Sequence, residues 1–472
     1  MILRPITVFI LCWKIHTEAA DPESNPKDLF RRGINKLRAA MNSDEDGPVP
    51  EAICDSTVLQ HHGHLSGRCD TKLFYWFFES RNNPKGSPTL VYFQGGPGAS
   101  SLYSALSGNG GPCIVDDTGN STSLNQYSWN THANVMYLDQ PAQVGFSRGS
   151  IPKCSVEASE STYSALEEFF TSRPEYNTRV FLAGQSYAGH FIPPLAAKLK
   201  ERNSFVRLEG ILLGNALVVP EIQWRSLPGM LRQSGMISRK EYEKLELKAK
   251  RFSKLVHTCN AMRERVGDEK TAKPELREQF ALNCKMALRV LMRDLILPVT
   301  LMGRNFLHLD SKHPLPEEDP SWMKVGAFAN SRPTQRYFGV DTAWRVINPD
   351  VHREFEVDTP RNYGQFLPNL LNRGLRVLVF AGDRDYLCNW MGSLAWTKRL
   401  DWMGSDTFRK SKLIGYRLRN GATVGKWKGS TLSSTGGQLI FMKLYGAGHY
   451  AAMDVPQPAL MMVDEFLNNK LR

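Results

Sequence analysis

The stretch RVFLAGQSYAGHF, residues 179–191, decides the fold. Its first half is a short apolar run, and its second half begins a helical pattern. Between the two lies Gly184-Gln185-Ser186-Tyr187-Ala188, a serine with small residues on both sides. A tight turn from a buried strand into a helix needs small residues there, because larger side chains would collide with the neighbouring strands. We therefore predict that this turn lifts the Ser186 hydroxyl clear of a sheet.

Apolar runs rich in β-branched and aromatic residues recur on both sides of this stretch. They lie at 73–80, 89–94, 134–140, 208–215, 376–382 and 439–448, with helical patterns such as 159–172 and 188–201 between them. Runs of this length are typical of strands buried on both faces of a mostly parallel sheet. The first two runs lie close together across Asn83-Pro84, which suggests an antiparallel start. The predicted class is α/β, with a mostly parallel central sheet flanked by helices.

Residues 224–335 depart from this rhythm. The segment is rich in Lys, Arg and Glu, and it carries helical periodicity. We interpret it as a largely helical insertion, a lid or cap over the sheet edge. The core would then comprise residues 21–223 and 336–472.

The composition is that of an ordinary globular protein. Of the 472 residues, 42% are hydrophobic and 22% are charged, which excludes a disordered, collagen-like or coiled-coil chain. The net charge of +12 could favour acidic partners, but basic and acidic residues are interleaved and no nucleic-acid-binding motif accompanies them. We therefore expect no nucleic acid partner.

The N-terminus indicates the secretory pathway. Residues 5–13 form a short apolar run after Arg4, and small residues follow it. This pattern predicts a signal peptide at residues 1–20, since a buried strand would be unusual at an extreme N-terminus with no turn before it. No other run approaches the ~20 apolar residues of a membrane helix, so no membrane span is expected. The sequon at Asn120 fits glycosylation along this route.

Later strand ends could supply the partners that a serine nucleophile needs. A base activates the hydroxyl, and an acid orients the base. In this kind of sheet the order along the chain is serine, acid, histidine, and the carboxyl ends of the strands meet at one crevice. Asp383 and Asp385 follow the run at 376–382, and His449 follows the last run. A lone histidine is more often structural, but three elements in this order favour a triad.

A glycine loop could supply an oxyanion hole. FQGGPGASS, residues 93–101, follows a predicted strand, and glycine lets backbone N–H groups approach a substrate oxygen closely. Such a hole takes one N–H from this loop and one from the residue after the nucleophile, which nominates Gly96 and Tyr187. A phosphate cradle is the competing interpretation, but the loop lacks the spacing of phosphate-binding motifs.

Seven blocks in order resemble the serine carboxypeptidase family. They read FYWFFESRNNP, GGPGASS, NVMYLDQPAQVGFS, GQSYAGHFIP, GILLGN, AGDRDYLCNW with a later AW, and AGH with a later DVP. The resemblance covers nearly the whole chain after about residue 60 and lapses mainly in 224–335. It implies an α/β-hydrolase fold and removal of C-terminal residues from peptides through an acyl-enzyme, with no metal and no cofactor. Because the family works mostly in acidic compartments, we expect a secreted or vacuolar/lysosomal protein.

The resemblance also places the triad. The family's three residues fall on Ser186, Asp385 and His449. Asp385 is preferred to Asp383 because the family's acid lies three residues before the cysteine of the CNW block, here Cys388. The family's oxyanion donors coincide with the two residues nominated above.

The sequence departs from the family where the substrate's terminal carboxylate is bound. The family uses a tryptophan, an asparagine and two glutamates, and the matching positions are Tyr92, Gln94, Asn109 and Gln185. The spacing around Asn109 is shifted. Ala99 replaces a family cysteine, and no cysteine lies between 284 and 388 to serve as its partner. The triad is intact, whereas both acidic groups of the carboxylate site have become amides.

Cysteine usage fits an oxidising compartment. The chain has eight cysteines, at 12, 54, 69, 113, 154, 259, 284 and 388. Loss of Cys12 with the signal peptide leaves an odd number, so at least one thiol stays free or pairs outside the chain. No spacing resembles a zinc site, so no metal is expected.

The pairing can be predicted in part. Cys259 and Cys284 lie 25 residues apart between two helical patterns, and we predict a disulfide there. The four cysteines from 54 to 154 can pair in three ways, which stay open. Cys388 is predicted to be a free thiol beside the pocket, and a buried, inert thiol is the alternative.

Three functional hypotheses follow. The first is a serine carboxypeptidase that acts on peptide or protein substrates, as a monomer or homodimer. The second is an esterase or acyltransferase on the same scaffold, since an acyl-enzyme can pass to acceptors other than water. The third is a binding or inhibitory protein with a relic site, and the intact triad speaks against it.

Overall fold

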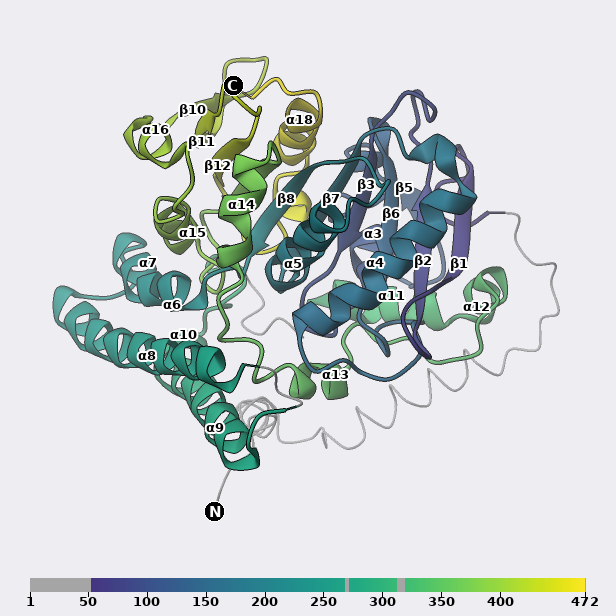
Figure 1. Ribbon diagram of the computed structural model, residues 1–472. Coiled ribbons are helices and arrows are strands. Elements are labelled where there is room, and N and C mark those ends of the chain that lie inside the picture. Colours follow the sequence, from purple (N-terminus) through teal and green to yellow (C-terminus); the bar gives the residue numbers. More distant parts are fainter. Residues whose placement is uncertain (1–51, 268–270, 312–318, 472) are drawn as a thin grey trace, which may run out of the picture.

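The computed structural model describes residues 52–267, 271–311 and 319–471 (Figure 1). The predicted signal peptide and Cys12 lie outside the described residues. Within those residues, no helix combines the length and the apolar character that crossing a membrane requires.

A 10-stranded sheet forms the centre of the described chain (Figure 1). Its spatial order is β1-β2-β6-β3-β7-β8-β9-β12-β11-β10. In this order the strands from β6 to β12 are parallel, whereas β1 and β2 at one edge and β11 and β10 at the other are antiparallel to their neighbours. The strands are β1 (Gln60–Ser66), β2 (Lys72–Phe78), β3 (Thr89–Phe93), β6 (Asn134–Leu138), β7 (Val180–Ser186), β8 (Leu208–Ala216), β9 (Arg376–Gly382), β10 (Ile414–Arg417), β11 (Thr423–Thr431) and β12 (Gln438–Leu444). The predicted α/β class with a mostly parallel sheet is confirmed.

Helices cover both faces of this sheet. One face carries α4 (Ser155–Ser172), α5 (Ala188–Glu201), α14 (Leu367–Asn372) and α15 (Trp390–Thr397), and the other carries α3 (Ser101–Leu106) and α18 (Pro456–Leu467). Successive strand residues alternate between the two apolar layers, as Val91 and Tyr92 of β3 do. Because both faces are buried, the strands read as continuous apolar runs in the sequence.

The antiparallel start differs in detail from the sequence-based expectation. The first two apolar runs, β2 and β3, do not pair with each other, because β6 lies between them. The hairpin partner of β2 is β1, whose sequence QHHGHLS has no apolar run. The edge strand β10 and its neighbour β11 also lack such runs, since both are partly exposed and carry polar and basic residues.

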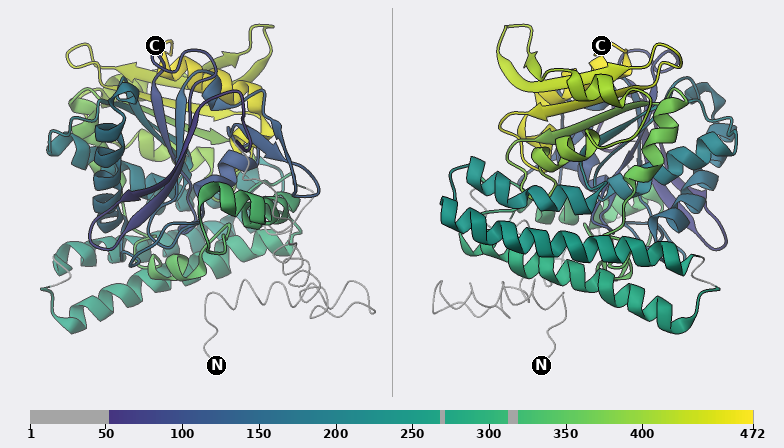
Figure 2. Two further views of the ribbon diagram at one scale, coloured as in Figure 1. Left: turned by 90° about the vertical axis from the view of Figure 1, so that its right-hand side faces the viewer. Right: turned by 60° about the vertical axis from the view of Figure 1, so that its left-hand side comes forward.

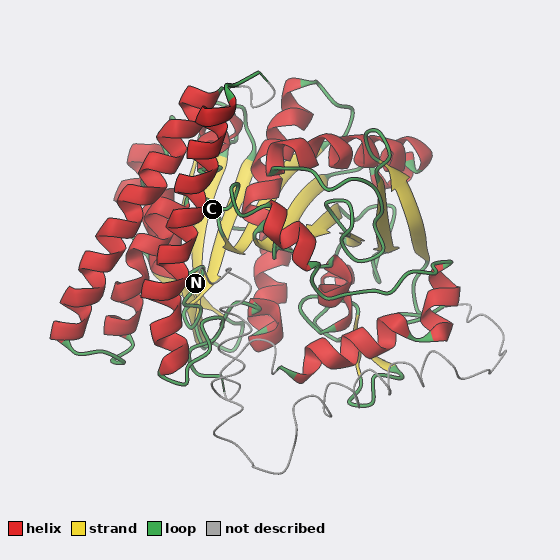
Figure 3. Ribbon diagram, turned by 90° about the horizontal axis from the view of Figure 1, so that it is seen from below, coloured by secondary structure: helices red, strands yellow, loops and turns green. Residues whose placement is uncertain are grey.

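The regular elements in the described part of residues 224–335 are helical. They are η3 (Trp224–Ser226), α7 (Leu227–Gln233), α8 (Arg239–Val266), α9 (Pro274–Leu291), a π-helical turn (Met292–Ile296), α10 (Leu297–Leu301), α11 (Pro320–Asn330) and α12 (Arg332–Phe338). α8 and α9 lie side by side as a long hairpin (Figures 2 and 3). A disulfide joins Cys259 to Cys284, with the Cα atoms 5.0 Å apart. The spacing of these two cysteines had predicted this bond.

These helices fall into two groups. α7 to α10 share an apolar cluster with the strand-end edge of the sheet, and this cluster includes Phe252, Leu291 and Tyr187. α11 and α12 instead join the apolar layer on the α18 face through Phe328 and Phe338. The predicted boundary after residue 335 falls inside α12, so that helix continues into the predicted core.

The remaining elements are short. β4 (Cys113–Val115) and β5 (Thr122–Leu124) form a small sheet of their own. The short helices are η1 (Trp129–Thr131), η2 (Pro174–Tyr176), α6 (Pro220–Gln223), α13 (Pro349–Glu354), η6 (Gly364–Phe366), α16 (Ser405–Lys410) and α17 (Ala451–Asp454).

Candidate active site

The serine lies at a sharp turn between β7 and α5. Ser186 ends the strand with a φ of +60°, a left-handed conformation that costs a non-glycine residue energy and is found mostly at functional sites. A Cβ on Gly184 would lie 2.5 Å from the Ala188 Cβ and 2.7 Å from the Phe93 carbonyl oxygen, so only glycine fits there. The small residues on both sides of Ser186 therefore exist because strand, helix and neighbouring strand approach each other closely.

His449 is oriented by a buried carboxylate. Its Nδ1 lies 2.7 Å from Oδ2 of Asp385, which is fully buried, and His449 itself is 4% exposed. A carboxylate accepts hydrogen bonds, so Nδ1 carries the proton and Nε2 is left as the basic nitrogen. Asn215 Nδ2 donates to the same Oδ2 at 2.7 Å, and the backbone N–H of Cys388 donates to Oδ1 at 3.1 Å. These neutral donors hold the carboxylate in place.

Asp383, the other acid of this loop, has a different partner. Its Oδ1 accepts the backbone N–H of Gly446 at 2.8 Å, and it pairs with Arg384. The choice of Asp385 over Asp383 thus agrees with the contact to His449.

The loops that carry the acid and the histidine are joined by a segment of the predicted insertion. The Phe306 carbonyl accepts the N–H groups of Tyr386 and Leu387, both at 3.1 Å, and the Leu307 carbonyl accepts the N–H of His449 at 2.8 Å. These bonds involve backbone atoms, and no side-chain pattern announces them. This support therefore leaves no trace in the sequence.

The glycine loop lies directly against the serine turn. A Cβ on Gly95 would be 2.5 Å from the backbone nitrogen of Tyr187 and 2.6 Å from the Ser186 Cβ. Gly96 follows with a φ of +104° and is exposed, and α5 begins directly after Tyr187. The two predicted oxyanion donors therefore belong to adjoining backbone segments, one of them at the positive end of a helix.

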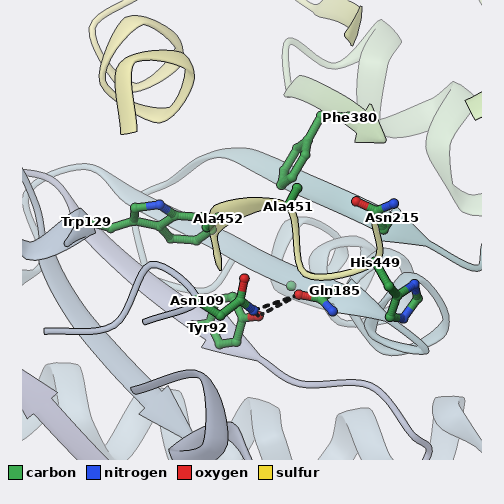
Figure 4. A pocket seen from close by; sticks show the side chains of 10 residues that line it. Tyr92, Asn109, Trp129, Gln185, Asn215, Phe380, His449, Ala451 and Ala452 are labelled. Carbon is green, nitrogen blue, oxygen red and sulfur yellow. Dashed lines mark hydrogen bonds between the residues drawn. The ribbon is translucent and has the colours of Figure 1, made fainter. Parts of the chain in front are cut away.

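The four positions predicted to bind a carboxylate come together in a buried polar cluster, of which Figure 4 shows Tyr92, Asn109 and Gln185. Tyr92, Gln94, Asn109 and Gln185 are each at most 5% exposed. Asn109 Nδ2 donates to Gln185 Oε1 at 2.8 Å and to Ser104 Oγ at 3.0 Å, and the Tyr92 hydroxyl donates to Gln94 Oε1 at 3.1 Å. Burial raises the pKa of Tyr92 above its ordinary value, so its hydroxyl stays neutral.

One donor of this cluster is unused. Gln185 Nε2 is buried and has no hydrogen-bond partner among the described residues. Its Oε1 faces Asn109 and Tyr92, and Nε2 lies on the side of His449 (Figure 4). A small pocket lies between this cluster and His449, and Trp129 and Asn215 also line it. Trp129 was not predicted. Asn215 ends the apolar run at 208–215, and its place at this edge of the sheet agrees with the sequence, which assigned it no role.

Cys388 lies behind the acid and the histidine. It is a thiol, 1% exposed, and it is not among the residues that line the small pocket. Burial, and then the charge of Asp385, raise its pKa well above the ordinary value. Its Sγ and ligand atoms of Asp385 and His449 lie within 4.8 Å of one another, but the hydrogen bond between the other two engages them with each other. This position favours the alternative of a buried, inert thiol.

The other described cysteines and the sequon do not line the small pocket. Cys54 and Cys113 form a disulfide with a Cα separation of 5.4 Å, while Cys69 and Cys154 remain thiols. None of the three full pairings of these four cysteines is therefore formed. Asn120 is exposed in the turn between β4 and β5.

Comparisons with known proteins agree with this geometry. The family model described as "Serine carboxypeptidase" matches residues 50–469. A carboxypeptidase Y homolog A of Trichophyton rubrum is 33% identical over 435 residues, which cover 89% of this chain and 76% of the relative. The homolog of Botryotinia fuckeliana is 32% identical over 480 residues, or 97% of this chain and 82% of the relative.

A solved structure supports the fold. The prohormone-processing carboxypeptidase Kex1 of Saccharomyces cerevisiae superimposes with a TM-score of 0.69 over 88% of this chain and 93% of its own, at 22% identity. The α/β-hydrolase fold is thus confirmed. With a family model that spans nearly all described residues, the chain belongs to the serine carboxypeptidase family.

Proposed function

We propose that this serine carboxypeptidase releases the C-terminal residue of peptides through an acyl-enzyme on Ser186. The observation that carries the proposal is the hydrogen bond between His449 Nδ1 and buried Asp385, in a loop after the last parallel strand. It leaves His449 Nε2 free to act as a base toward a hydroxyl at the same edge of the sheet. The family membership makes the protein a serine-type hydrolase.

A residue of this chain can perform each step of acylation and deacylation. His449 takes the proton of Ser186 as the hydroxyl attacks the carbonyl carbon of the last peptide bond. The negative oxygen of the tetrahedral intermediate accepts the N–H groups of Gly96 and Tyr187. His449 gives its proton to the leaving amine, and water then attacks the acyl-enzyme with His449 again as the base. Asp385 stabilises the imidazolium in both halves of the reaction.

The buried polar cluster would hold the substrate's terminal carboxylate. The unused Nε2–H of Gln185 supports this assignment, because an unpaired buried donor is costly unless a ligand satisfies it. Its amide cannot turn over without losing the bond from Asn109 Nδ2, so a donor faces the substrate at every pH. The alternative is that these amides only hold the loop.

The uncharged carboxylate-binding cluster is also compatible with esterase or acyltransferase activity. The unused Gln185 Nε2–H can donate to a neutral carbonyl oxygen as well as to a carboxylate, so esters or peptide amides could bind at the same place. An esterase or acyltransferase on this scaffold is therefore the alternative, and a relic site without turnover is the last.

Mass spectrometry of one blocked dipeptide, offered as the free acid and as the C-terminal amide, separates these functions. A carboxypeptidase releases the last residue from the acid much faster than from the amide, and Ser186→Ala abolishes both reactions. Equal turnover of acid and amide, or transfer to an added alcohol, would support the alternative. Labelling of the wild type but not of Ser186→Ala by a fluorophosphonate would exclude the relic.

We also propose that the protein enters the secretory pathway and is secreted or vacuolar/lysosomal, as a monomer or homodimer. The two disulfides support an oxidising compartment, and Asn120 is exposed enough to be glycosylated. Removal of N-linked glycans from protein expressed in a eukaryotic host, with Asn120→Gln as the control, tests the route by a mass shift in the wild type alone.

A further inference from the structure

A buried carboxylate outside the triad accepts a hydrogen bond from the residue that follows the nucleophile. Asp358 is 1% exposed, and its Oδ2 accepts the hydroxyl of Tyr187 at 2.7 Å. We infer that Asp358 is a positioning residue that fixes Tyr187 and thereby aims the Tyr187 backbone N–H into the oxyanion hole. This inference rests on the proposed function and adds a residue that the family blocks quoted above do not contain.

Asp358 is held firmly enough to act as a fixed point. Its Oδ2 also accepts the Ser155 hydroxyl at 2.6 Å and the Ser155 N–H at 3.2 Å, at the start of α4. Its Oδ1 accepts Arg361 Nη1 at 3.0 Å and the hydroxyl of Tyr363. The paired guanidinium and the further donors satisfy a charge that would otherwise be expensive to bury. Asp358 thus connects α4, the serine turn and its own loop.

Tyr187 depends on this fixed point for its orientation. Its ring is 2% exposed and stacks on His190 with the centroids 4.5 Å apart, and it touches Phe191 and Phe355 edge-on. Packing of this kind restricts a ring but lets it slide, whereas the hydroxyl contact to Asp358 fixes its far end. Because Tyr187 is directly joined to Ser186, a shift of the ring moves the backbone N–H beside the nucleophile.

The loop that carries Asp358 is itself anchored on the helical hairpin. Asn260 of α8 donates from Nδ2 to the Pro360 carbonyl at 3.1 Å, and its Oδ1 accepts the Asn362 N–H at 3.0 Å. Asn260 adjoins Cys259, which the disulfide ties to α9. The insertion therefore supports the oxyanion hole from a distance through this loop.

Two matched variants test the inference. Tyr187→Phe and Tyr363→Phe each remove one hydroxyl from the same carboxylate, but only Tyr187 carries the oxyanion N–H. Removal of a whole oxyanion donor costs about 10²–10³-fold in kcat, so a displaced donor should cost roughly 10-fold. We expect this loss of kcat in Tyr187→Phe, with KM within about twofold and a similar weakening of a peptide aldehyde, whose adduct carries the oxyanion. Tyr363→Phe should lose clearly less kcat and aldehyde affinity than Tyr187→Phe, because Ser155 and Arg361 still hold Asp358.

Equal losses in the two variants, or a Tyr187→Phe protein that keeps its kcat and aldehyde affinity, would overturn the inference. Should Tyr187→Phe fail to fold, Asn260→Ala provides the second measurement, since it loosens the loop without touching Asp358 or Tyr187. We then expect a smaller loss of kcat at constant KM, and an unchanged kcat would contradict the inference. A wild type that releases no C-terminal residue would instead reject the proposed function.

Discussion

The pair of Asp385 and His449 and the cluster around Gln185 lie on either side of one small pocket. The pair consists of ionisable groups, whereas the cluster consists of neutral ones. The pair is a buried acid held against a base at 2.7 Å, and its chemistry depends on charge. The cluster consists of amides and hydroxyls that bond one another, and none of its groups ionises in the ordinary pH range. Bond cleavage in this protein should therefore depend on pH, whereas recognition of the substrate's terminal carboxylate should not.

Asp385→Asn removes the negative charge of the Asp385–His449 pair and has the largest expected effect on kcat. The amide cannot stabilise the imidazolium and reverses the hydrogen bond to Nδ1, so kcat should fall about 10⁴-fold. Steady-state kinetics on a blocked dipeptide measure this. Asp383→Asn is the matched control and should change kcat less than about threefold. Similar losses in both variants would show that the acid has been misassigned.

Asn215→Gly tests whether the neutral donors are needed to hold the Asp385 carboxylate in its orientation toward His449. Glycine accommodates the φ of +41° at this position. The change removes the side-chain amide, which donates to Asp385 at 2.7 Å and accepts the Gly382 N–H at 3.4 Å. With one of its hydrogen bonds gone the carboxylate can turn, and we expect kcat to fall roughly 10-fold at constant KM. A change in KM alone would assign Asn215 to the pocket wall and not to the acid.

Asp139 is a buried carboxylate whose hydrogen-bond partners are all neutral, and its effect on the free energy of unfolding can be measured. It lies beneath the oxyanion loop, where the Ser100 hydroxyl and the Ser101 N–H each donate to it at 2.7 Å. Burial raises its pKa to about 7, and these hydrogen bonds oppose the rise. Between about pH 4 and pH 7 the native state then binds a proton that the unfolded state has lost, so the free energy of unfolding falls as pH rises.

Urea unfolding of the wild type and of Asp139→Asn at pH 5 and pH 7 measures this effect. The wild type should lose about 2 kcal/mol more than the variant between the two values, because the other titrating groups cancel in the difference. Parallel pH dependence of the two proteins would mean that the hydrogen bonds compensate for burial.

Cys388→Ala should have the smallest effect. The side chain is buried behind the pair, and only its backbone N–H bonds to Asp385. We expect kcat and KM to stay within about threefold of the wild type. In the wild type a maleimide should modify exposed Cys69 well before Cys388, as peptide mapping would show. A rapid loss of activity that follows modification of Cys388 would place the thiol in the pocket after all.

The sequence predicts the parts of this site that depend on local geometry. The turn at Ser186 needs small neighbours, and the acid and the histidine follow buried strands in a fixed order, so all three can be read along the chain. Asn215 ends a strand in the same way, but nothing in its surroundings indicates a contact with Asp385. Phe306 and Leu307 act through their carbonyl groups, which carry no residue-specific signal.

The fold shows the same division between local and non-local information. Continuous apolar runs identify the buried parallel strands, whereas the place of β6 between β2 and β3 depends on pairing between distant segments. β1 and β10 are partly exposed edge strands, and their polar sequences do not distinguish them from loops. Cys54 and Cys113 likewise meet only because separate segments fold together.

The pH dependence of kcat and KM, from about pH 4.5 to 8, for one blocked dipeptide tests the comparison most directly. In the wild type kcat should fall on acidification as His449 becomes protonated, while KM should stay level because Gln185 and Asn109 donate at every pH. In Gln185→Glu a carboxylate would face the substrate's own, so KM should rise toward neutral pH in the variant alone. A wild-type KM that climbs steeply above pH 6 and is unchanged by Gln185→Glu would contradict the account.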